Sequence, residues 1–200
     1  MLLLLLRRKK YHGAVAWKMI LLELLLVAAG VIGTKLMYFI ENGQFGGSSL
    51  FGAVLFIPVF ILPALAMRLS YRDILNLCGP AVGLMLAIMK FECWFNGCCF
   101  GKYLPSLRVQ FPSQVVEAAF AALLTVALLI IEKHKRDTHL YAWLLIFYGS
   151  TRLMLNGFRY IVQPFIWNLT CGQFWGLVSV VIGITWLVLA SKVKVKRSSA

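Results

Sequence analysis

The sequence predicts an all-α membrane protein, a polytopic bundle of about six transmembrane helices. Two observations indicate this class. Of the 200 residues, 61% are hydrophobic and only 14% are charged, which lies outside the range of ordinary soluble domains. The apolar residues also come in blocks long enough for a helix to cross a bilayer core about 30 Å thick. This pattern excludes a disordered chain, a small disulfide scaffold and a soluble catalytic domain.

Six apolar stretches meet the length requirement, and each is expected to form one transmembrane helix. In chain order they are Val15–Phe39, Leu50–Met67, Ile74–Trp94, Val115–Ile131, Leu140–Leu155 and Cys171–Leu189. We expect residues 15–190 to form a single transmembrane domain, with a basic cytoplasmic segment (1–14) before it and a basic cytoplasmic tail (191–200) after it. The run Leu2–Leu6 is too short for a signal-peptide core, so the first long helix is expected to act as the targeting signal.

The basic residues predict the orientation, because Lys and Arg gather on the cytoplasmic side of membrane proteins. Fourteen fall on one side of a six-helix bundle: Arg7, Arg8, Lys9, Lys10, Lys18, Arg68, Arg72, Lys133, Lys135, Arg136, Lys192, Lys194, Lys196 and Arg197. Five fall on the other side, and Lys35 lies inside the first span. Both termini are therefore expected in the cytoplasm. Topology and contact with anionic lipid explain the net charge of +13, so no nucleic acid is expected as a partner.

The connections on the outer side hold the polar residues that topology does not explain. Five ionisable groups lie at helix ends toward that side: Lys90, Glu92, Glu117, Arg152 and Arg159. An ionisable group at membrane depth costs about 2.5–3.5 kcal/mol on insertion scales, and it is usually kept where it faces the bundle interior. Arg152 and Arg159 are two helical turns apart with Asn156 between them, which predicts a row of donors suited to a lipid phosphate. The alternative is that each group reaches the interface and pairs for packing.

Glycines and cysteines mark the same connections. The first connection contains Gly46 and Gly47, and the second contains Gly97 and Gly101. These glycines are compatible either with an anion-binding nest of backbone amides or with plain turns. Three cysteines crowd the second connection: Cys93, Cys98 and Cys99. They lack the spacing of zinc sites, which pair Cys-x-x-Cys motifs or combine Cys with His, so neither a metal nor a cofactor is expected. The sequence is compatible both with a disulfide among these cysteines and with free thiols. The three histidines fall on the cytoplasmic side, which leaves three candidate bases at the outer face: Glu117, Glu92 and Lys90.

Five motifs in these connections resemble, in the same order, those of the bacterial prolipoprotein diacylglyceryl transferase family. Gly46–Gly52 resembles Gly-Gly-x-Ser-Phe-His-Gly-Gly, and Lys90–Gly101 resembles Arg-x-x-Asn-Phe-x-Asn-Gly-Glu-x-x-Gly. Phe111–Glu117 is similar to His-Pro-Ser-Gln-Leu-Tyr-Glu, and Tyr148–Arg159 is similar to Tyr-Gly-x-x-Arg-Phe-x-x-Glu-x-x-Arg. Leu169–Gln173 resembles the family's entry into its last helix.

The resemblance implies a substrate pair. Enzymes of that family take diacylglyceryl from phosphatidylglycerol and join it as a thioether to a cysteine of a lipoprotein precursor. It implies phosphatidylglycerol or another anionic phospholipid and a lipoprotein precursor as partners, and a place in the bacterial inner membrane. With the charge pattern, it points to Arg152, Glu117 and Lys90 as catalytic residues. The residues expected to bind substrate are Asn96, Gly97, Gly101, Gln114, Arg159, Asn156, Gly46 and Gly47.

The sequence departs from the family motifs at several of these positions. Phe51 and Phe111 stand in place of histidines. Lys90 stands in place of an arginine, and Cys98 and Asn156 stand in place of glutamates. Two hypotheses follow: a divergent transferase, or a phospholipid-binding scaffold or accessory subunit of the same fold without the chemistry. A thiol redox protein is a third, disfavoured because adjacent cysteines close only a strained ring.

Overall fold

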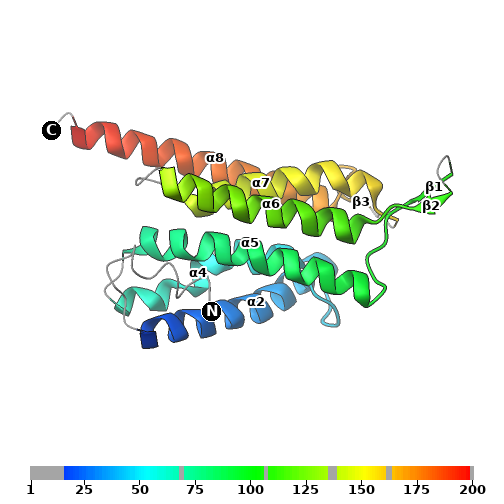
Figure 1. Cartoon of the computed structure of the whole chain (residues 1–200), viewed down its shortest axis with the longest axis horizontal. Helices are drawn as coiled ribbons and strands as arrows, with labels where there is room; N and C mark the ends of the chain where they lie inside the picture. The colour runs from blue at the N-terminus through cyan, green and yellow to red at the C-terminus, as the bar shows by residue number, and fades with distance from the viewer. Residues whose placement is uncertain (1–15, 68–69, 106–107, 135–138, 161–163, 199–200) are drawn as a thin grey trace. The chain divides into compact units, whose positions relative to one another are not determined.

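The computed structural model describes residues 16–67, 70–105, 108–134, 139–160 and 164–198 (Figure 1). The chain divides into two compact units, Met1–Ala81 and Val82–Ala200, and the boundary falls inside helix α5 (Tyr71–Phe95). Four described helices are long and apolar enough to cross a membrane, over Ile20–Asn42, Tyr71–Phe95, Ser113–His134 and Cys171–Lys192. The chain is therefore a helical, multi-pass membrane protein. Six spans and the orientation of the bundle stay predictions.

Unit 1 consists of α2 (Ala16–Asn42), three short helical segments and the first part of α5. Helix α2 packs against α3 (Leu50–Leu55) at a point where two glycines meet, Gly33 and Gly52. A Cβ on Gly33 would lie 2.6 Å from the carbonyl oxygen of Gly52, so the two backbones touch and no side chain fits between them. Small residues at such crossings allow close helix packing where the hydrophobic effect does not drive it.

The single helix predicted over Leu50–Met67 is wrong. The structure has α3, then α4 (Ile57–Phe60) and the 3-10 helix η2 (Leu62–Met67). Pro58 and Pro63 lack the backbone N–H that would continue an α-helix, and each disfavours the helical conformation of the residue before it. The carbonyl oxygen of Pro58 accepts a 2.6 Å hydrogen bond from the hydroxyl of Tyr71, at the start of α5.

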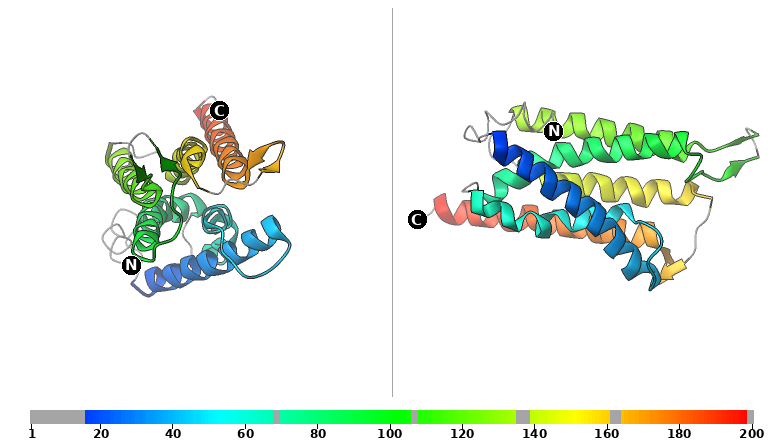
Figure 2. Two further views of the ribbon diagram at one scale, coloured as in Figure 1. Left: turned by 90° about the vertical axis from the view of Figure 1, so that its right-hand side faces the viewer. Right: turned by 90° about the horizontal axis from the view of Figure 1, so that it is seen from below.

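Unit 2 holds the rest of α5 together with α6 (Ser113–His134), α7 (Leu140–Leu155) and α8 (Cys171–Ser198). Helices α6, α7 and α8 run side by side (Figure 2). Gly149 on α7 faces Gly176 on α8 so closely that a Cβ on Gly149 would lie 2.5 Å from the carbonyl oxygen of Gly176. Apart from the broken second span, each predicted helix is present, with ends that differ from the prediction by up to nine residues.

The connections at one end of unit 2 carry its short strands. Two residue pairs, Tyr103–Leu104 (β1) and Val109–Gln110 (β2), form an antiparallel hairpin, with Tyr103 opposite Gln110. After α7 come the 3-10 helix η3 (Asn156–Phe158) and a second antiparallel pair, β3 (Pro164–Ile166) with β4 (Leu169–Thr170). The amide of Lys102 donates a 2.7 Å hydrogen bond to the carbonyl of Phe158, which ties the two connections together.

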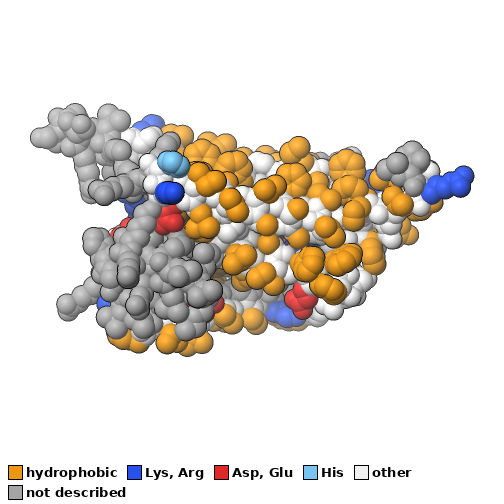
Figure 3. Space-filling model, viewed as in Figure 1, with side chains coloured by type: hydrophobic (Ala, Val, Ile, Leu, Met, Phe, Trp, Pro, Cys, Tyr) orange, Lys and Arg blue, Asp and Glu red, His pale blue; other side chains and the backbone are white. Residues whose placement is uncertain are grey.

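Apolar side chains cover much of the visible surface of the described helices (Figure 3). Four such residues follow one another along α6: Phe120, Leu123, Val126 and Ile130. A water-soluble protein rarely exposes contiguous apolar patches of more than a few hundred Å², whereas a helix surrounded by acyl chains exposes them without penalty.

The predicted segments 1–14 and 191–200 fall mostly outside the described side chains, and the single domain over 15–190 stays a prediction.

Candidate functional site

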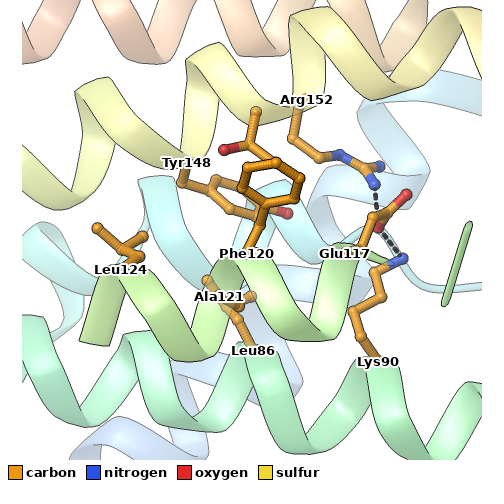
Figure 4. A pocket seen from close by; sticks show the side chains of 9 residues that line it. Leu86, Lys90, Glu117, Phe120, Ala121, Leu124, Tyr148 and Arg152 are labelled. Carbon is orange, nitrogen blue, oxygen red and sulfur yellow. Dashed lines mark hydrogen bonds and ion pairs between the residues drawn. The ribbon is translucent and has the colours of Figure 1, made fainter. Parts of the chain in front are cut away.

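Four charged side chains, from helices α5, α6 and α7 and from the residue that follows η3, meet in a charge cluster within unit 2. Glu117, in the second turn of α6, points its Oε2 at Lys90 of α5, whose Nζ lies 2.7 Å away (Figure 4). The same oxygen accepts a 2.7 Å hydrogen bond from Nη1 of Arg152 on α7. Nε of Arg159 lies 3.8 Å from the other carboxylate oxygen of Glu117. The charge cluster thus brings together four of the residues singled out in the sequence.

The charge cluster carries an excess of positive charge. Its three cations and one carboxylate give a net charge of +2. Lys90, Glu117 and Arg152 are all buried, and buried charges are costly unless they are paired and hydrogen-bonded. The carboxylate neutralises one cation, so an added anion would bring the cluster closer to neutrality. The arrangement is therefore suited to bind an anionic group.

A pocket opens beside the charge cluster. Its lining residues are Leu86, Lys90, Glu117, Phe120, Ala121, Leu124, Tyr148, Thr151 and Arg152. In Figure 4, Lys90 and Arg152 reach Glu117 from opposite sides, and Leu124 lies away from this charged end. One charged end and an otherwise largely apolar wall suit an amphiphilic ligand.

Helical spacing explains why each helix supplies both a charged and an apolar part of the pocket. Leu86 lies one turn before Lys90 in α5, and Tyr148 lies one turn before Arg152 in α7. Residues three, four and seven positions apart share one helix face. Three residues of α6 follow Glu117 at this spacing: Phe120, Ala121 and Leu124. Of the residues that line the pocket, the sequence had indicated only Lys90, Glu117 and Arg152, although the same spacing would have identified their apolar neighbours.

Two buried side chains fasten the loop after α5 to the start of α6. Nε2 of Gln114 donates a 2.6 Å hydrogen bond to the carbonyl of Cys98, and the hydroxyl of Ser113 donates one of 2.6 Å to the carbonyl of Cys99. Gln114 lies three residues before Glu117, so the loop is held next to the charge cluster. Oε1 of Gln114 is buried and has no hydrogen-bond partner among the described residues.

The two glycines of this loop have different structural roles. Gly97 has a φ of 61°, in the left-handed region where a side chain is strained. At Gly101 a Cβ would lie 2.5 Å from the carbonyl oxygen of Phe111. Gly101 also pairs with Arg159 in an isolated antiparallel bridge. The bridge between Gly101 and Arg159 therefore helps to place Arg159 in the charge cluster.

Asn156 is buried but is not part of the pocket lining. Its Nδ2 donates a hydrogen bond to Oγ1 of Thr170, and a Cβ on Gly172 would lie 2.6 Å from its Oδ1. The amide of Thr170 in turn donates a 3.1 Å hydrogen bond to Oε1 of Gln173. Asn156 thus joins η3 to β4 and to the first turn of α8. The described hydrogen bond of its side chain is made to Thr170 and not to the charge cluster.

The remaining predicted residues are not part of the charge cluster. Gly46 and Gly47 belong to unit 1, in the loop between α2 and α3, where Gly47 packs against the ring of Tyr38. Asn96 is exposed, and its side chain makes no hydrogen bond within the described parts of the chain. Glu92 is exposed as well and forms no ion pair with any described residue. Of the candidate bases, only Glu117 and Lys90 therefore lie in the charge cluster.

Three cysteine sulfurs come together where α5 ends, and we call them the sulfur cluster. The Sγ atoms of Cys93, Cys98 and Cys99 lie within 4.8 Å of one another. All three are free thiols, and Cys98 and Cys99 are exposed. The amide of Cys98 donates a 3.1 Å hydrogen bond to the carbonyl of Cys93, and Cys99 has a φ of 61°. The loop therefore folds back over the last turn of α5.

Comparison with known proteins agrees with the motifs. A family model described as prolipoprotein diacylglyceryl transferase matches residues 1–189. The phosphatidylglycerol–prolipoprotein diacylglyceryl transferase of Clostridium tetani (strain Massachusetts / E88) is 24% identical over 186 residues, which cover 79% of this chain and 75% of the relative. The resemblance found in the five motifs is confirmed. Since the family model matches nearly the whole chain, the protein belongs to the prolipoprotein diacylglyceryl transferase family, whose members are membrane transferases of lipoprotein biosynthesis.

Proposed function

We propose that this protein transfers diacylglyceryl from phosphatidylglycerol to a cysteine thiol of a lipoprotein precursor, at the outer face of the bacterial inner membrane. Membership of the family supports the class of reaction. One structural observation supports the donor: a buried charge cluster of net charge +2 at one end of a largely apolar pocket. A phospholipid has the matching distribution, with an anionic phosphate joined to an apolar body.

The two ends of the pocket suit different parts of the lipid. The apolar side chains of α5 and α6, among them Leu86 and Leu124, would contact the glyceryl group and the first methylenes of the acyl chains. The guanidinium of Arg152 and the ammonium of Lys90 would hold the phosphate. Glu117 keeps these two cations in place before the lipid arrives, because two like charges would otherwise repel each other.

The reaction proposed is a displacement at carbon. The acceptor thiolate attacks C3 of the glyceryl group, the bond from C3 to the phosphate oxygen breaks, and glycerol phosphate leaves with the electron pair. Negative charge builds on the phosphate as it leaves. Arg152, Lys90 and Arg159 stabilise that charge in a site with little water, which is where preorganised charges have the largest effect on a rate.

A turnover assay tests this function. The purified protein in detergent micelles is given labelled phosphatidylglycerol and a lipobox peptide, and released glycerol phosphate is measured. We expect release that Arg152→Ala abolishes. Arg108→Gln, which removes an exposed cation next to β2, serves as the matched control and should keep the release. Absence of release from the unmodified protein would contradict the proposal.

A second function, a phospholipid-binding scaffold without chemistry, is favoured by the two phenylalanines at the family's histidine positions. Phe51 is buried in unit 1, and the ring of Phe111 packs against that of Phe158, with 5.1 Å between the ring centroids. Neither can accept a proton from a thiol. Under this alternative the protein binds phosphatidylglycerol saturably, Arg152→Ala weakens the binding, and no glycerol phosphate is released.

A further inference from the structure

The sulfur cluster has no part in the reaction described above, although its geometry is that of a set of metal ligands. Thiolates bound to one zinc ion at about 2.3 Å in tetrahedral geometry lie about 3.8 Å apart. The three Sγ atoms already lie within 4.8 Å of one another, and small rotations of the exposed Cys98 and Cys99 would close the difference. We propose that Cys93, Cys98 and Cys99 bind a zinc ion whose fourth position is open to the thiol of the acceptor.

The backbone of the loop holds the three ligands in place. The left-handed conformations of Gly97 and Cys99 turn the chain back over α5. Such a conformation is unfavourable for a residue with a side chain, and it persists where the surrounding structure enforces it. Here the enforcement comes from Gln114 and Ser113, which bind the carbonyls of Cys98 and Cys99 with two hydrogen bonds of 2.6 Å. The ligands are therefore arranged by contacts made without the metal.

The number and type of ligands favour zinc with an open coordination position. Soft thiolates select zinc and copper(I) over hard cations. Structural zinc sites have four protein ligands, whereas three protein ligands leave a position for water or substrate. Within the described residues no fourth His, Cys, Asp or Glu joins the three cysteines. Because Cys98 and Cys99 are exposed, a thiol from outside can reach this position.

Such a zinc ion would supply the thiolate that the reaction needs. A thiol that coordinates zinc gives up its proton to water without a general base. Among the candidate bases in the charge cluster, Glu117 already accepts from Lys90 and Arg152, and protonation would break both ion pairs. The sequence spacing had indicated no metal, because the motif is Cys-x4-Cys-Cys rather than a pair of Cys-x-x-Cys.

The position of the sulfur cluster fits this role, which rests on the proposed function. Cys93 follows Lys90 by three residues in α5, so both lie on one face of the helix. The zinc-bound thiolate forms the S–C bond at C3 of the diacylglyceryl group while the C3–O bond breaks, and glycerol phosphate leaves with the electron pair. The thioether product carries no charge, is a weaker ligand than the thiolate, and leaves the metal.

Metal binding is measured first. The full chain is purified in detergent with a reductant, loaded with Zn²⁺ or Co²⁺ and freed of excess metal. We expect about one metal ion per chain and, with Co²⁺, the absorption of a thiolate-to-cobalt charge transfer. The double variant Cys98→Ser, Cys99→Ser should lose both signals, and Cys171→Ser, which removes a cysteine outside the sulfur cluster, should keep them. Binding that survives the double substitution, or no binding at all, would overturn the proposal.

The open position is measured next, without phospholipid. A lipobox peptide should change the cobalt absorption as its thiol enters the fourth position, and the same peptide with serine in place of cysteine should not. An unchanged spectrum overturns the proposal. A changed spectrum without release of glycerol phosphate in the turnover assay upholds the metal site and refutes the transferase function. Full release by the double cysteine variant refutes the metal site and upholds the transferase function.

Discussion

Arg152 donates a hydrogen bond of 2.7 Å to Glu117, which lies 35 positions earlier in the sequence and on a different helix. Lys90 approaches the same carboxylate oxygen, also to 2.7 Å. A single oxygen atom therefore sets the positions of two buried cations, and a change at Glu117 acts on both at once.

Replacing the carboxylate by an amide should destabilise the protein and increase its response to lipid. In Glu117→Gln, Lys90 and Arg152 lose their counterion inside the protein, and removing one partner of a buried ion pair costs about 3–5 kcal/mol. Phosphatidylglycerol brings a negative charge that replaces the lost carboxylate. Thermal unfolding in micelles should show a lower melting temperature than the unmodified protein and a larger upward shift on adding phosphatidylglycerol. Equal shifts in the two proteins would refute the proposed phosphate position.

Removing the loosely held arginine should weaken lipid binding with little effect on stability. Arg159 lies 3.8 Å from Glu117, and 24% of its side chain is exposed, so its ion pair contributes at most about 1 kcal/mol to stability. A hydrogen bond to a charged phosphate contributes about 1.5–3 kcal/mol. We expect Arg159→Gln to lower the affinity for fluorescent phosphatidylglycerol by roughly tenfold or more. Arg108→Gln is the matched control, and equal affinities of the two variants would argue against Arg159 as a ligand of the phosphate.

Filling the apolar part of the pocket should interfere with the lipid without touching the charge cluster. Ala121 lines the pocket, whereas Ala119, two positions earlier in α6, is exposed and does not. Extra methylenes in a packed site cost about 1–3 kcal/mol. Ala121→Leu should therefore raise the KM for phosphatidylglycerol, and Ala119→Leu should leave it unchanged. Similar kinetics for both variants would place the lipid elsewhere.

The close contact at Gly101 can be tested by a pair of glycine substitutions. A Cβ on Gly101 would meet the carbonyl oxygen and the side chain of Phe111, whereas nothing lies within 4 Å of a Cβ on Gly157. We expect Gly101→Ala to lower stability by about 1–3 kcal/mol and Gly157→Ala to be neutral or to stabilise by up to about 1 kcal/mol. The melting temperatures of the two variants, measured by thermal unfolding, test this expectation. If Gly101→Ala melts like the unmodified protein, this contact does not shape the loop.

The sequence was most informative where one physical requirement dominates. Apolar length predicted helices α2, α5, α6, α7 and α8, since a segment that buries its backbone in lipid has to be helical. Apolar length gave a wrong prediction for Leu50–Met67. This segment is apolar enough to span a membrane, but Pro58 and Pro63 remove backbone donors that a continuous helix needs. Proline inside an apolar stretch is not decisive by itself, because Pro80 lies within α5 and the helix continues.

Within the candidate site, the sequence indicated the charged residues but not their arrangement. Lys90, Glu117 and Arg152 stood out because charge is rare at membrane depth. Whether they meet depends on the rotation of three helices, which hydropathy does not encode. Asn156 shows the converse case: its spacing from Arg152 suggested a ligand, yet its side chain donates its described hydrogen bond to Thr170 and packs close to Gly172. The same residue types stabilise a fold and form a binding site, so only the contacts in the structure distinguish the two roles.

Helix α7 is short, with 16 residues from Leu140 to Leu155. At about 1.5 Å per residue its length is about 24 Å, several ångström less than the hydrocarbon thickness of a typical bilayer. If α7 crosses the bilayer, as the sequence predicts, the bilayer has to become thinner beside it, or one end of the helix stays below the headgroups. Where the bilayer thins, Arg152, in the last turn, comes closer in depth to the phosphates of the neighbouring lipids. Thinning at α7 would thus shorten the distance that a lipid has to travel from the leaflet to the guanidinium.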